Sequence, residues 1–293
     1  MADGALRHLI CATILIVSPL FIPAHTFVPY IYAPTPQKLK GAGISIGHVA
    51  AQLLQLNQPQ ESAKLAALAV QLRPRDDRLW SILAEAQLRS GQLGAAARSL
   101  AQAKELNPNK AELWFAEASL ALRANRPKIA VDLLDHGLEL DPDNASAYFD
   151  LGNARIMQDQ FRLALKAFEK ATAIRPGFWE ALNNQALVLF EMGNRSEAIR
   201  RWRHVLEINA SPESMLALAA ALNSEQPGDN EAFNLATKAL ATDPNYVLTS
   251  HQKQHLWGLQ LRWATERLLE EPTLRTSVVR AEANASPDNY QHR

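Results

Sequence analysis

The chain has 293 residues with 30 basic and 30 acidic side chains, so its formal net charge is zero. A balanced charge gives no general attraction to nucleic acid or to acidic membrane surfaces. Hydrophobic residues make up 47% of the chain, which excludes global disorder, and 48 alanines against 12 glycines favour helix. The single cysteine, Cys11, excludes an intramolecular disulfide framework and a thiolate-rich zinc site.

The N-terminal segment is the most apolar part of the chain. Residues 9–22 are almost wholly apolar and follow Arg7, an arrangement typical of an export signal. The apolar character continues to residue 32, so a retained, proline-kinked anchor is a second interpretation and a helix packed on the body of the protein is a third. We predict that residues 1–33 are a signal peptide or membrane anchor. The protein is then exported to a periplasm, lumen or other extracytoplasmic space, or is membrane-anchored. Positive charges on both flanks leave the side of the membrane open.

A period of 34 residues runs through the rest of the chain. Prolines stand in this phase at Pro74, Pro108, Pro142, Pro176 and Pro244. Turn-forming residues stand halfway between them, at Asn57, Gly91, Asn125, Asp159, Gly193 and Pro227. Small residues recur where paired helices would cross, and large ones such as Phe168 and Trp202 would fill the spaces beside them. Each unit is therefore predicted to be a helix, a tight turn and a second helix.

In these columns the chain resembles the tetratricopeptide repeat family. The resemblance covers residues 43–246 as six units, at 43–76, 77–110, 111–144, 145–178, 179–212 and 213–246. It implies an all-α fold in which the helical hairpins stack as a right-handed α-solenoid. The second to fifth units fit the pattern best, because the first lacks a large aromatic residue and the sixth has Pro227 in its turn.

The two ends of the array are predicted separately. Residues 34–42, with two prolines and a glycine, are expected to be a linker. A solenoid needs a cover for the apolar face of its last unit, so residues 247–271 are predicted to hold a capping helix from His251 to Glu270. Its apolar face would carry Leu256, Leu259, Trp263 and Leu268. Residues 272–293 are predicted to be a short helix and a disordered tail.

Motifs that would indicate chemistry are absent from the sequence. It has no phosphate-binding, zinc-protease or serine-hydrolase motif, so we predict that the protein is not an enzyme and uses no cofactor. His251 and His255 would share one helix face, but no third ligand stands between them. We interpret them as exposed polar residues and predict no metal. The basic run from Arg195 to His204 surrounds Trp202, so we interpret it as a solvated outer face and predict no nucleic-acid binding.

The resemblance also implies a binding surface. In tetratricopeptide repeat proteins the first helices line a concave groove that binds peptides or protein segments. The corresponding positions here are Arg89, Phe115, Arg123, Phe149, Asn153, Met157, Asn183, Asn184 and Leu187. The two phenylalanines have an alternative interpretation as core residues between repeats. Chaperone adaptors of this family clamp a terminal carboxylate with cations, but Phe149 stands at the position of the first lysine, so no carboxylate clamp is predicted.

We predict a scaffold or assembly factor that binds a protein segment at or near a membrane. An apolar N-terminus ahead of a repeat array resembles bacterial envelope scaffolds and thylakoid-anchored assembly factors for photosynthetic complexes. An accessory or regulatory subunit of an envelope or photosynthetic enzyme complex is the alternative function. A nucleic-acid-binding solenoid is a further alternative, which the neutral charge disfavours.

Overall fold

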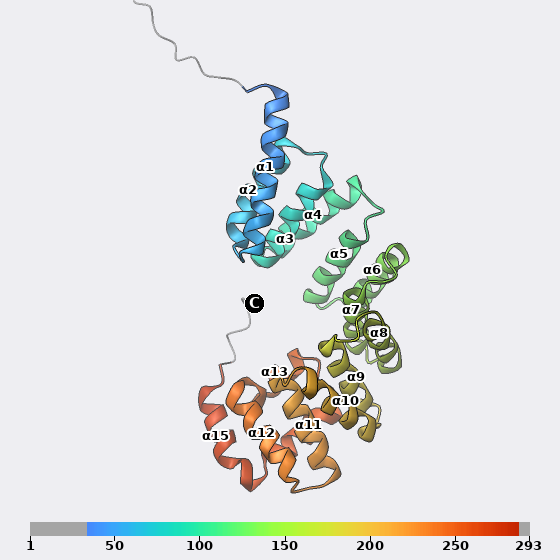
Figure 1. Cartoon of the computed structure of the whole chain (residues 1–293), viewed down its shortest axis with the longest axis vertical. Coiled ribbons are helices and arrows are strands. Elements are labelled where there is room, and N and C mark those ends of the chain that lie inside the picture. Colours follow the sequence, from blue (N-terminus) through green and yellow to red (C-terminus); the bar gives the residue numbers. More distant parts are fainter. Residues whose placement is uncertain (1–33, 287–293) are drawn as a thin grey trace, which may run out of the picture. The chain divides into compact units, whose positions relative to one another are not determined.

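The structure, a computed structural model, describes residues 34–286. All regular elements in this part of the chain are helices, and residues 34–286 contain no β-strand. From Pro36 onward the chain forms one compact unit, in which consecutive helices contact one another in sequence order (Figure 1). The prediction of an all-α helical solenoid is therefore confirmed.

Six helical hairpins follow one another along the chain. Their helices are α1 (Pro36–Gln55) and α2 (Pro59–Leu72), α3 (Asp77–Arg89) and α4 (Leu93–Leu106), α5 (Ala111–Arg123) and α6 (Pro127–Leu140), α7 (Ala145–Ile156) and α8 (Phe161–Ile174), α9 (Trp179–Glu191) and α10 (Arg195–Ile208), and α11 (Pro212–Glu225) and α12 (Asn230–Thr242). Each first helix packs on the second helix of its own hairpin, and each second helix packs on the first helix of the next hairpin. Most contacts between units join units that are neighbours in the sequence, as is typical of a repeat array.

The turn inside each hairpin follows from the residue type at its midpoint. Asn57, Asn125 and Asp159 take left-handed backbone angles with φ between 54° and 56°, a region that Asn and Asp tolerate better than other side chains. Glycines take the same role in the second and fifth hairpins, where Gly91 and Gly193 have φ of 77° and 82°. These residues follow the end of the first helix and allow the second to begin two residues later.

Small side chains let the paired helices approach closely. A Cβ on Gly152 would lie 2.4 Å from Cε1 of Phe168, which is fully buried, and a Cβ on Gly137 would lie 2.4 Å from Cε1 of Phe115. The corresponding alanines on the second helices are fully buried as well, at Ala96, Ala130, Ala164, Ala198 and Ala232. The core thus consists of large rings and branched side chains set against small residues at close-packed density.

The predicted linker at residues 34–42 is wrong, because α1 begins at Pro36 and continues without a break to Gln55. Proline is tolerated in the first turn of a helix, where its missing N–H has no partner to lose. Of the three glycines of this helix, Gly41 has open space around it, whereas Gly43 and Gly47 lie at close contacts with neighbouring helices. A Cβ on Gly43 would lie 3.1 Å from Cβ of Leu72, and one on Gly47 would lie 2.2 Å from Cδ2 of Leu79.

The single capping helix predicted from His251 to Glu270 is also wrong, because the structure breaks it into two. A 3-10 turn, η1 (Pro244–Val247), is followed by α13 (Thr249–Gln254) and α14 (Leu259–Leu269). The break lies at Leu256, whose φ is +60°, and at Gly258. As a result Leu259 and Trp263 are exposed, whereas Leu268 is buried as predicted, together with Leu261.

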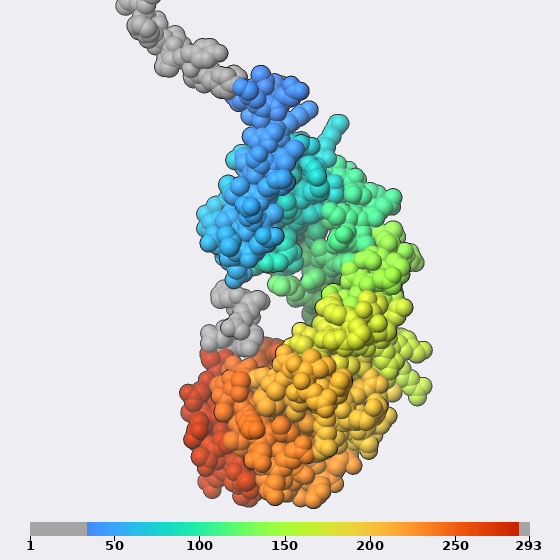
Figure 2. All heavy atoms as spheres, viewed as in Figure 1, coloured from blue at the N-terminus to red at the C-terminus, as the bar shows by residue number. Residues whose placement is uncertain are grey.

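The C-terminal helices cover the last hairpin. Helix α14 packs on α11 and α9, and a second 3-10 turn, η2 (Pro272–Leu274), leads into α15 (Arg275–Asn284). Helix α15 packs on α12 and η1, and Leu274 between them is fully buried. Figure 2 shows these elements, in orange and red, as one closely packed block. The cap is therefore larger than the single helix that the sequence predicts.

The predicted signal peptide or membrane anchor, residues 1–33, lies outside the described residues, as does the end of the predicted tail, 287–293. Within residues 34–286, no helix combines the length and the apolarity that a membrane span needs.

Replacing Leu274 by alanine should lower the free energy of unfolding by about 2–5 kcal/mol, because this fully buried leucine joins α15 to the core. Val279→Ala on α15, which directly follows Leu274, is the matched control, since Val279 is 58% exposed and its truncation should cost below about 0.5 kcal/mol. Urea unfolding followed by circular dichroism measures both. Equal stability of the two variants would mean that α15 does not belong to the folded core.

Candidate peptide-binding site

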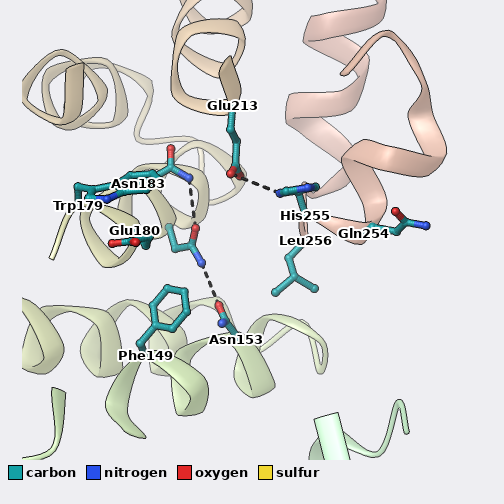
Figure 3. A pocket seen from close by; sticks show the side chains of 10 residues that line it. Phe149, Asn153, Trp179, Glu180, Asn183, Glu213, Gln254, His255 and Leu256 are labelled. Atoms are coloured by element: carbon teal, nitrogen blue, oxygen red, sulfur yellow. Dashed lines mark hydrogen bonds and ion pairs between the residues drawn. The ribbon is translucent and has the colours of Figure 1, made fainter. Parts of the chain in front are cut away.

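A cavity of about 200 Å³ opens where the fourth and fifth hairpins meet the cap. It is lined by residues of α7, α9 and α11 together with the turn after α13 (Figure 3). The lining residues are Phe149, Asn153, Trp179, Glu180, Asn183, Asn184, Glu213, Gln254, His255 and Leu256. The first helices of three repeats thus form one side of the site, and a loop from the C-terminal cap forms the other.

A relay of side-chain amides crosses this site. The indole Nε1 of Trp202 donates to Oδ1 of Asn183 over 3.0 Å, and the hydroxyl of Ser214 donates to the same oxygen over 2.9 Å. Nδ2 of Asn183 donates to Oδ1 of Asn184 over 3.3 Å, and Nδ2 of Asn184 donates to Oδ1 of Asn153 over 2.9 Å. Figure 3 shows the last two bonds as a line from α9 to α7.

The direction of the relay is fixed by Trp202. An indole N–H can only donate, so the atom of Asn183 that faces it has to be the oxygen, and each following amide is oriented in turn. The last amide, Asn153, therefore accepts with its oxygen and presents its NH₂ group at the other end. That group has no protein acceptor within residues 34–286, and Asn153 is only half-buried. The site offers a hydrogen-bond donor in a fixed place.

Aromatic rings form the apolar part of the site. The ring centroid of Phe149 lies 5.1 Å from that of Phe178 and 5.8 Å from that of Phe168, so Phe149 packs on the core. Phe149 is nevertheless partly exposed and lines the cavity together with Trp179. It therefore has both roles that the sequence left open, a packing residue on one side and a cavity wall on the other.

The titratable groups of the site belong to the contact between α11 and the cap. Nδ1 of His255 lies 3.4 Å from Oε2 of Glu213 and 3.1 Å from the hydroxyl of Tyr246. Burial works to lower the pKa of His255, but the hydrogen bond to Glu213 and the charges of Glu213 and Asp243 outweigh it, so the pKa is raised overall. The other oxygen of Glu213 accepts from Nε1 of Trp257 over 3.2 Å.

His251 is buried, at 4% exposure, and the expectation that it lies on an exposed helix face is wrong. Its ring packs at 4.5 Å from the ring of His255 and edge-on to Tyr246. Burial and the neighbouring charge of His255 lower the pKa of His251, against the pull of Asp243 and Glu213. Within the part of the chain that the structure describes, no three His, Cys, Asp or Glu residues form a group that could hold a metal ion.

The structure brings four of the nine predicted groove residues together, namely Phe149, Asn153, Asn183 and Asn184. Asn183 and Asn184 are at most 9% exposed and act within the relay rather than on the surface. Leu187 is 2% exposed and belongs to the core, so the prediction that it lines the groove is wrong. The α-helical face that holds it is turned toward the next hairpin.

The other predicted groove residues lie away from this cavity. Phe115 packs on α6 against Gly137, which favours its alternative interpretation as a core residue. Nε of Arg89 donates to Glu85 over 2.6 Å and its NH1 to the carbonyl of Leu54 over 3.3 Å, two repeats from the site. Arg123 and Met157 stand at the C-terminal ends of α5 and α7, outside the lining.

Sequence reasoning missed part of the lining. Glu180 stands one repeat after Ser146 and three repeats after Arg78, in a column of the first helix that the period does identify, so the register could have found it. His255 and Leu256 carry no such signal, because they reach the site from a loop about seventy to a hundred residues later in the chain. Only the fold brings them there.

A half-buried carboxylate, Asp150, was also missed. It stands one repeat before Asn184, in the same column, and it makes no ion pair or hydrogen bond with any residue of the described range. Burial raises the pKa of Asp150 from its ordinary value of 3.8 to about 6. A carboxylate that is desolvated without a partner is costly, and such groups gather at functional sites.

The basic run of α10 is neutralised by neighbouring acids. Arg200 and Arg201 both bind Glu197, Arg203 binds Glu231 at 2.8 Å, and Arg195 lies 3.6 Å from Glu225. Trp202 between them is fully buried and donates into the relay. The aromatic residue of this run is therefore unavailable for stacking on a base.

Comparison with known proteins identifies the repeats. The sequence model of the tetratricopeptide repeat family matches residues 115–177 and 151–202. No curated protein matches the chain significantly. Among solved structures, the crystal structure of MamA is 22% identical with a TM-score of 0.52, and the match covers 59% of this chain and 92% of MamA.

Two further solved structures have the same fold. YrrB, a tetratricopeptide repeat protein with an unusual peptide-binding site, is 17% identical with a TM-score of 0.51, over 65% of this chain and 95% of YrrB. PilF of Pseudomonas aeruginosa is 13% identical with a TM-score of 0.61, over 78% of this chain and 99% of PilF. At these identities the similarity is one of fold. The family match supports tetratricopeptide repeats over residues 115–202, and the solved structures show that the helical repeat fold is shared.

Asn183→Ala should lower the free energy of unfolding by about 1–3 kcal/mol, because it leaves the buried N–H of Trp202 without an acceptor. Asn153→Ala, at the exposed end of the same relay, should cost less than about 1 kcal/mol. Thermal and urea unfolding of the two variants test this difference. If both variants unfold like the original protein, the relay does not hold the buried indole.

Asp150→Asn should stabilise the protein at pH 7–8 and have little effect near pH 4. The folded-state pKa of about 6 lies above the unfolded value of 3.8, so the folded state binds the proton more tightly and stability falls as pH rises through this window. The gain in the free energy of unfolding at pH 7–8 is at most about 3 kcal/mol, because each pKa unit corresponds to about 1.36 kcal/mol. The measurement is the difference in unfolding free energy between variant and original at several pH values. A difference that does not change with pH would contradict the desolvated carboxylate.

Proposed function

We propose that the protein is a non-enzymatic scaffold that binds an extended protein segment on the first-helix face of its fourth and fifth repeats. The observation that carries this proposal is the NH₂ group of Asn153, which stands at the end of an oriented amide relay and beside two aromatic rings. A carbonyl group of a peptide backbone is the matching acceptor, since every residue of an extended segment supplies one.

The surroundings of Asn153 suit such a segment. Phe149 and Trp179 offer apolar surface on which side chains of the segment can pack. The relay is anchored in the core at Trp202, so the donor is held in place before the partner arrives, and little side-chain entropy is lost on binding. The lining contains no lysine or arginine, which supports recognition of an internal segment rather than of a terminal carboxylate.

The comparisons support the same class of function. The helical repeat fold is typical of interaction scaffolds, and the fold is shared with YrrB, a protein with a peptide-binding site. Two titratable side chains of the site, Glu213 and His255, are engaged with each other at the cap, which favours a structural role for them.

Asn153→Ala should weaken peptide binding three- to tenfold, in line with the loss of one hydrogen bond of about 0.5–1.5 kcal/mol. Asn153→Asp should weaken it further, because a carboxylate oxygen would face the peptide carbonyl. Peptides are selected from a displayed library on the original protein and their affinities measured by calorimetry. Lys166→Ala is the control, since Lys166 is exposed on α8, far from the lining. If all three variants bind like the original protein, the partner docks elsewhere.

We further propose that the N-terminal apolar segment brings this scaffold to a membrane, where it assists the assembly of a complex. The support is the sequence of residues 9–32, whose length and apolarity suit an export signal or an anchor. The folded repeats begin at Pro36, directly after this segment, so binding would take place close to the membrane surface if the segment is retained.

Removal of residues 1–33 should move the protein from the membrane or exported fraction to the soluble cytoplasmic fraction. Tagged full-length chain and a chain that starts at Pro34 are compared by fractionation, and the mass of the mature protein separates cleavage from anchoring. The folded part begins after the deletion, so both chains should melt at the same temperature. Identical distribution of the two chains would contradict the proposal that the N-terminal segment brings the protein to a membrane.

A further inference from the structure

The turn between α13 and α14 takes a backbone conformation that its residue type disfavours. Leu256 has a φ of +60°, while the other non-glycine residues with positive φ in residues 34–286 are two asparagines and one aspartate. A leucine in the left-handed region is strained, and such strain persists only where the surroundings hold the residue in place. Contacts with the rest of the fold must therefore hold this turn, residues 255–258, in place.

Two glutamates of the repeats hold the turn. Glu213 of α11 receives Nε1 of Trp257 at one oxygen and lies 3.4 Å from Nδ1 of His255 at the other. Glu191 of α9 accepts the backbone N–H groups of Gln260 and Leu261 over 3.0 and 2.9 Å. The first carboxylate fixes the beginning of the turn, and the second fixes its end.

The approach to Glu191 is so close that a side chain at Gly258 would displace the carboxylate. A Cβ at that position would lie 2.1 Å from the carboxyl carbon of Glu191. The turn is thus held by the sixth repeat through Glu213 and by the fifth repeat through Glu191, so the direction of the Leu256 side chain is determined by the repeats.

That direction is into the candidate site. Leu256 packs on the core cluster that contains Phe168 and Phe178, and it lines the same cavity as Phe149 and Asn153. Figure 3 shows its side chain pointing from the turn into the space between His255 and Asn153. A branched aliphatic side chain of the protein itself is therefore seated next to the free donor of the amide relay.

We propose that Leu256 is a tethered occupant of the peptide site, and that the partner is a segment with a leucine-like side chain that takes its place. This inference rests on the proposed function of the same site. Strain at Leu256 lowers the cost of releasing it, and a partner leucine can enter with a relaxed backbone. The turn then competes with the partner, so the affinity measured on the whole protein is lower than the affinity of the open site.

The experiment removes the side chain of Leu256 by substitution and supplies a leucine side chain on a separate peptide. In Leu256→Gly the glycine takes the left-handed backbone without strain, and in Leu256→Asn a polar side chain of similar size tolerates the same φ. Leu259→Ala is the matched control, since Leu259 is 47% exposed and outside the cavity. The probes are a labelled peptide with the sequence of residues 251–258 and its version with alanine in place of leucine.

We expect the leucine peptide to bind Leu256→Gly at least tenfold more tightly than it binds the original protein or Leu259→Ala. The alanine peptide should bind Leu256→Gly at least tenfold more weakly than the leucine peptide does, and Leu256→Asn should bind neither. Equal binding of the leucine peptide to Leu256→Gly and to the original protein, or equal binding of the two peptides, would overturn the inference. A melting curve of each variant shows that the fold is intact.

Failure of the proposed function has a different signature. Library-selected peptides that depend on Asn153 but bind Leu256→Gly and the original protein equally would leave the proposed function standing and reject the tethered occupant. The reverse result, a leucine peptide that binds Leu256→Gly without any effect of Asn153→Ala, would support the occupant and reject the relay as the element that recognises the partner.

Discussion

The buried N–H of Trp202 is the constraint from which the site follows. In the equivalent column of earlier repeats the second helix carries Leu100, Leu134 and Phe168, which need only space. A fully buried indole also needs an acceptor, because an unsatisfied N–H in the core costs about 1–3 kcal/mol. Asn183 supplies it in the column where Phe149 stands one repeat earlier. Once Asn183 has turned its oxygen inward, its NH₂ group has to find a partner, and Asn184 and Asn153 extend the chain of bonds to the surface. The presence of tryptophan at this core position, in place of leucine or phenylalanine, thus fixes the position of a hydrogen-bond donor at the surface.

The same end of the array departs from the rule that a repeat touches only its neighbours. Helix α14 packs on α11 and also on α9, and Glu191 of α9 accepts the first free N–H groups of α14. Negative charge at the N-terminus of a helix is favourable, so this contact both caps and anchors α14. The fifth repeat, the sixth repeat and the cap are consequently joined into one unit, whereas the first four repeats are linked in series. The candidate site lies at the boundary between the two kinds of packing.

The period of 34 residues was sufficient to predict the hairpins, because each column has a local physical cause that recurs. Gly91 and Asn125 turn the chain, and Gly152 lets a ring approach, whatever lies further along the sequence. The predictions failed where a residue's role depends on distant partners. Pro34, Pro36 and Gly41 suggest a linker by composition, yet α1 begins at Pro36, and Gly43 and Gly47 further along it are contact points for Leu72 and Leu79. His251 has the pattern of an exposed helix and is buried because Tyr246 folds over it. No local signal places Leu256 against the fourth and fifth repeats, since that contact is set by Glu191 and Glu213 across the fold.

The balance of charge in the site explains why direction rather than charge distinguishes it. Glu213 faces His255, whose raised pKa favours the protonated form, so these two charges offset each other. Glu180 lies in the first turn of α9, where the helix dipole stabilises a carboxylate. Within the amide relay of the described residues, the group left to bind a partner is the neutral NH₂ group of Asn153. A neutral hydrogen bond is little affected by salt, whereas ion pairs near the surface are screened within about 8–10 Å at ordinary ionic strength. A site of this kind discriminates by geometry, because a segment that cannot place a carbonyl oxygen before Asn153 leaves a desolvated donor behind.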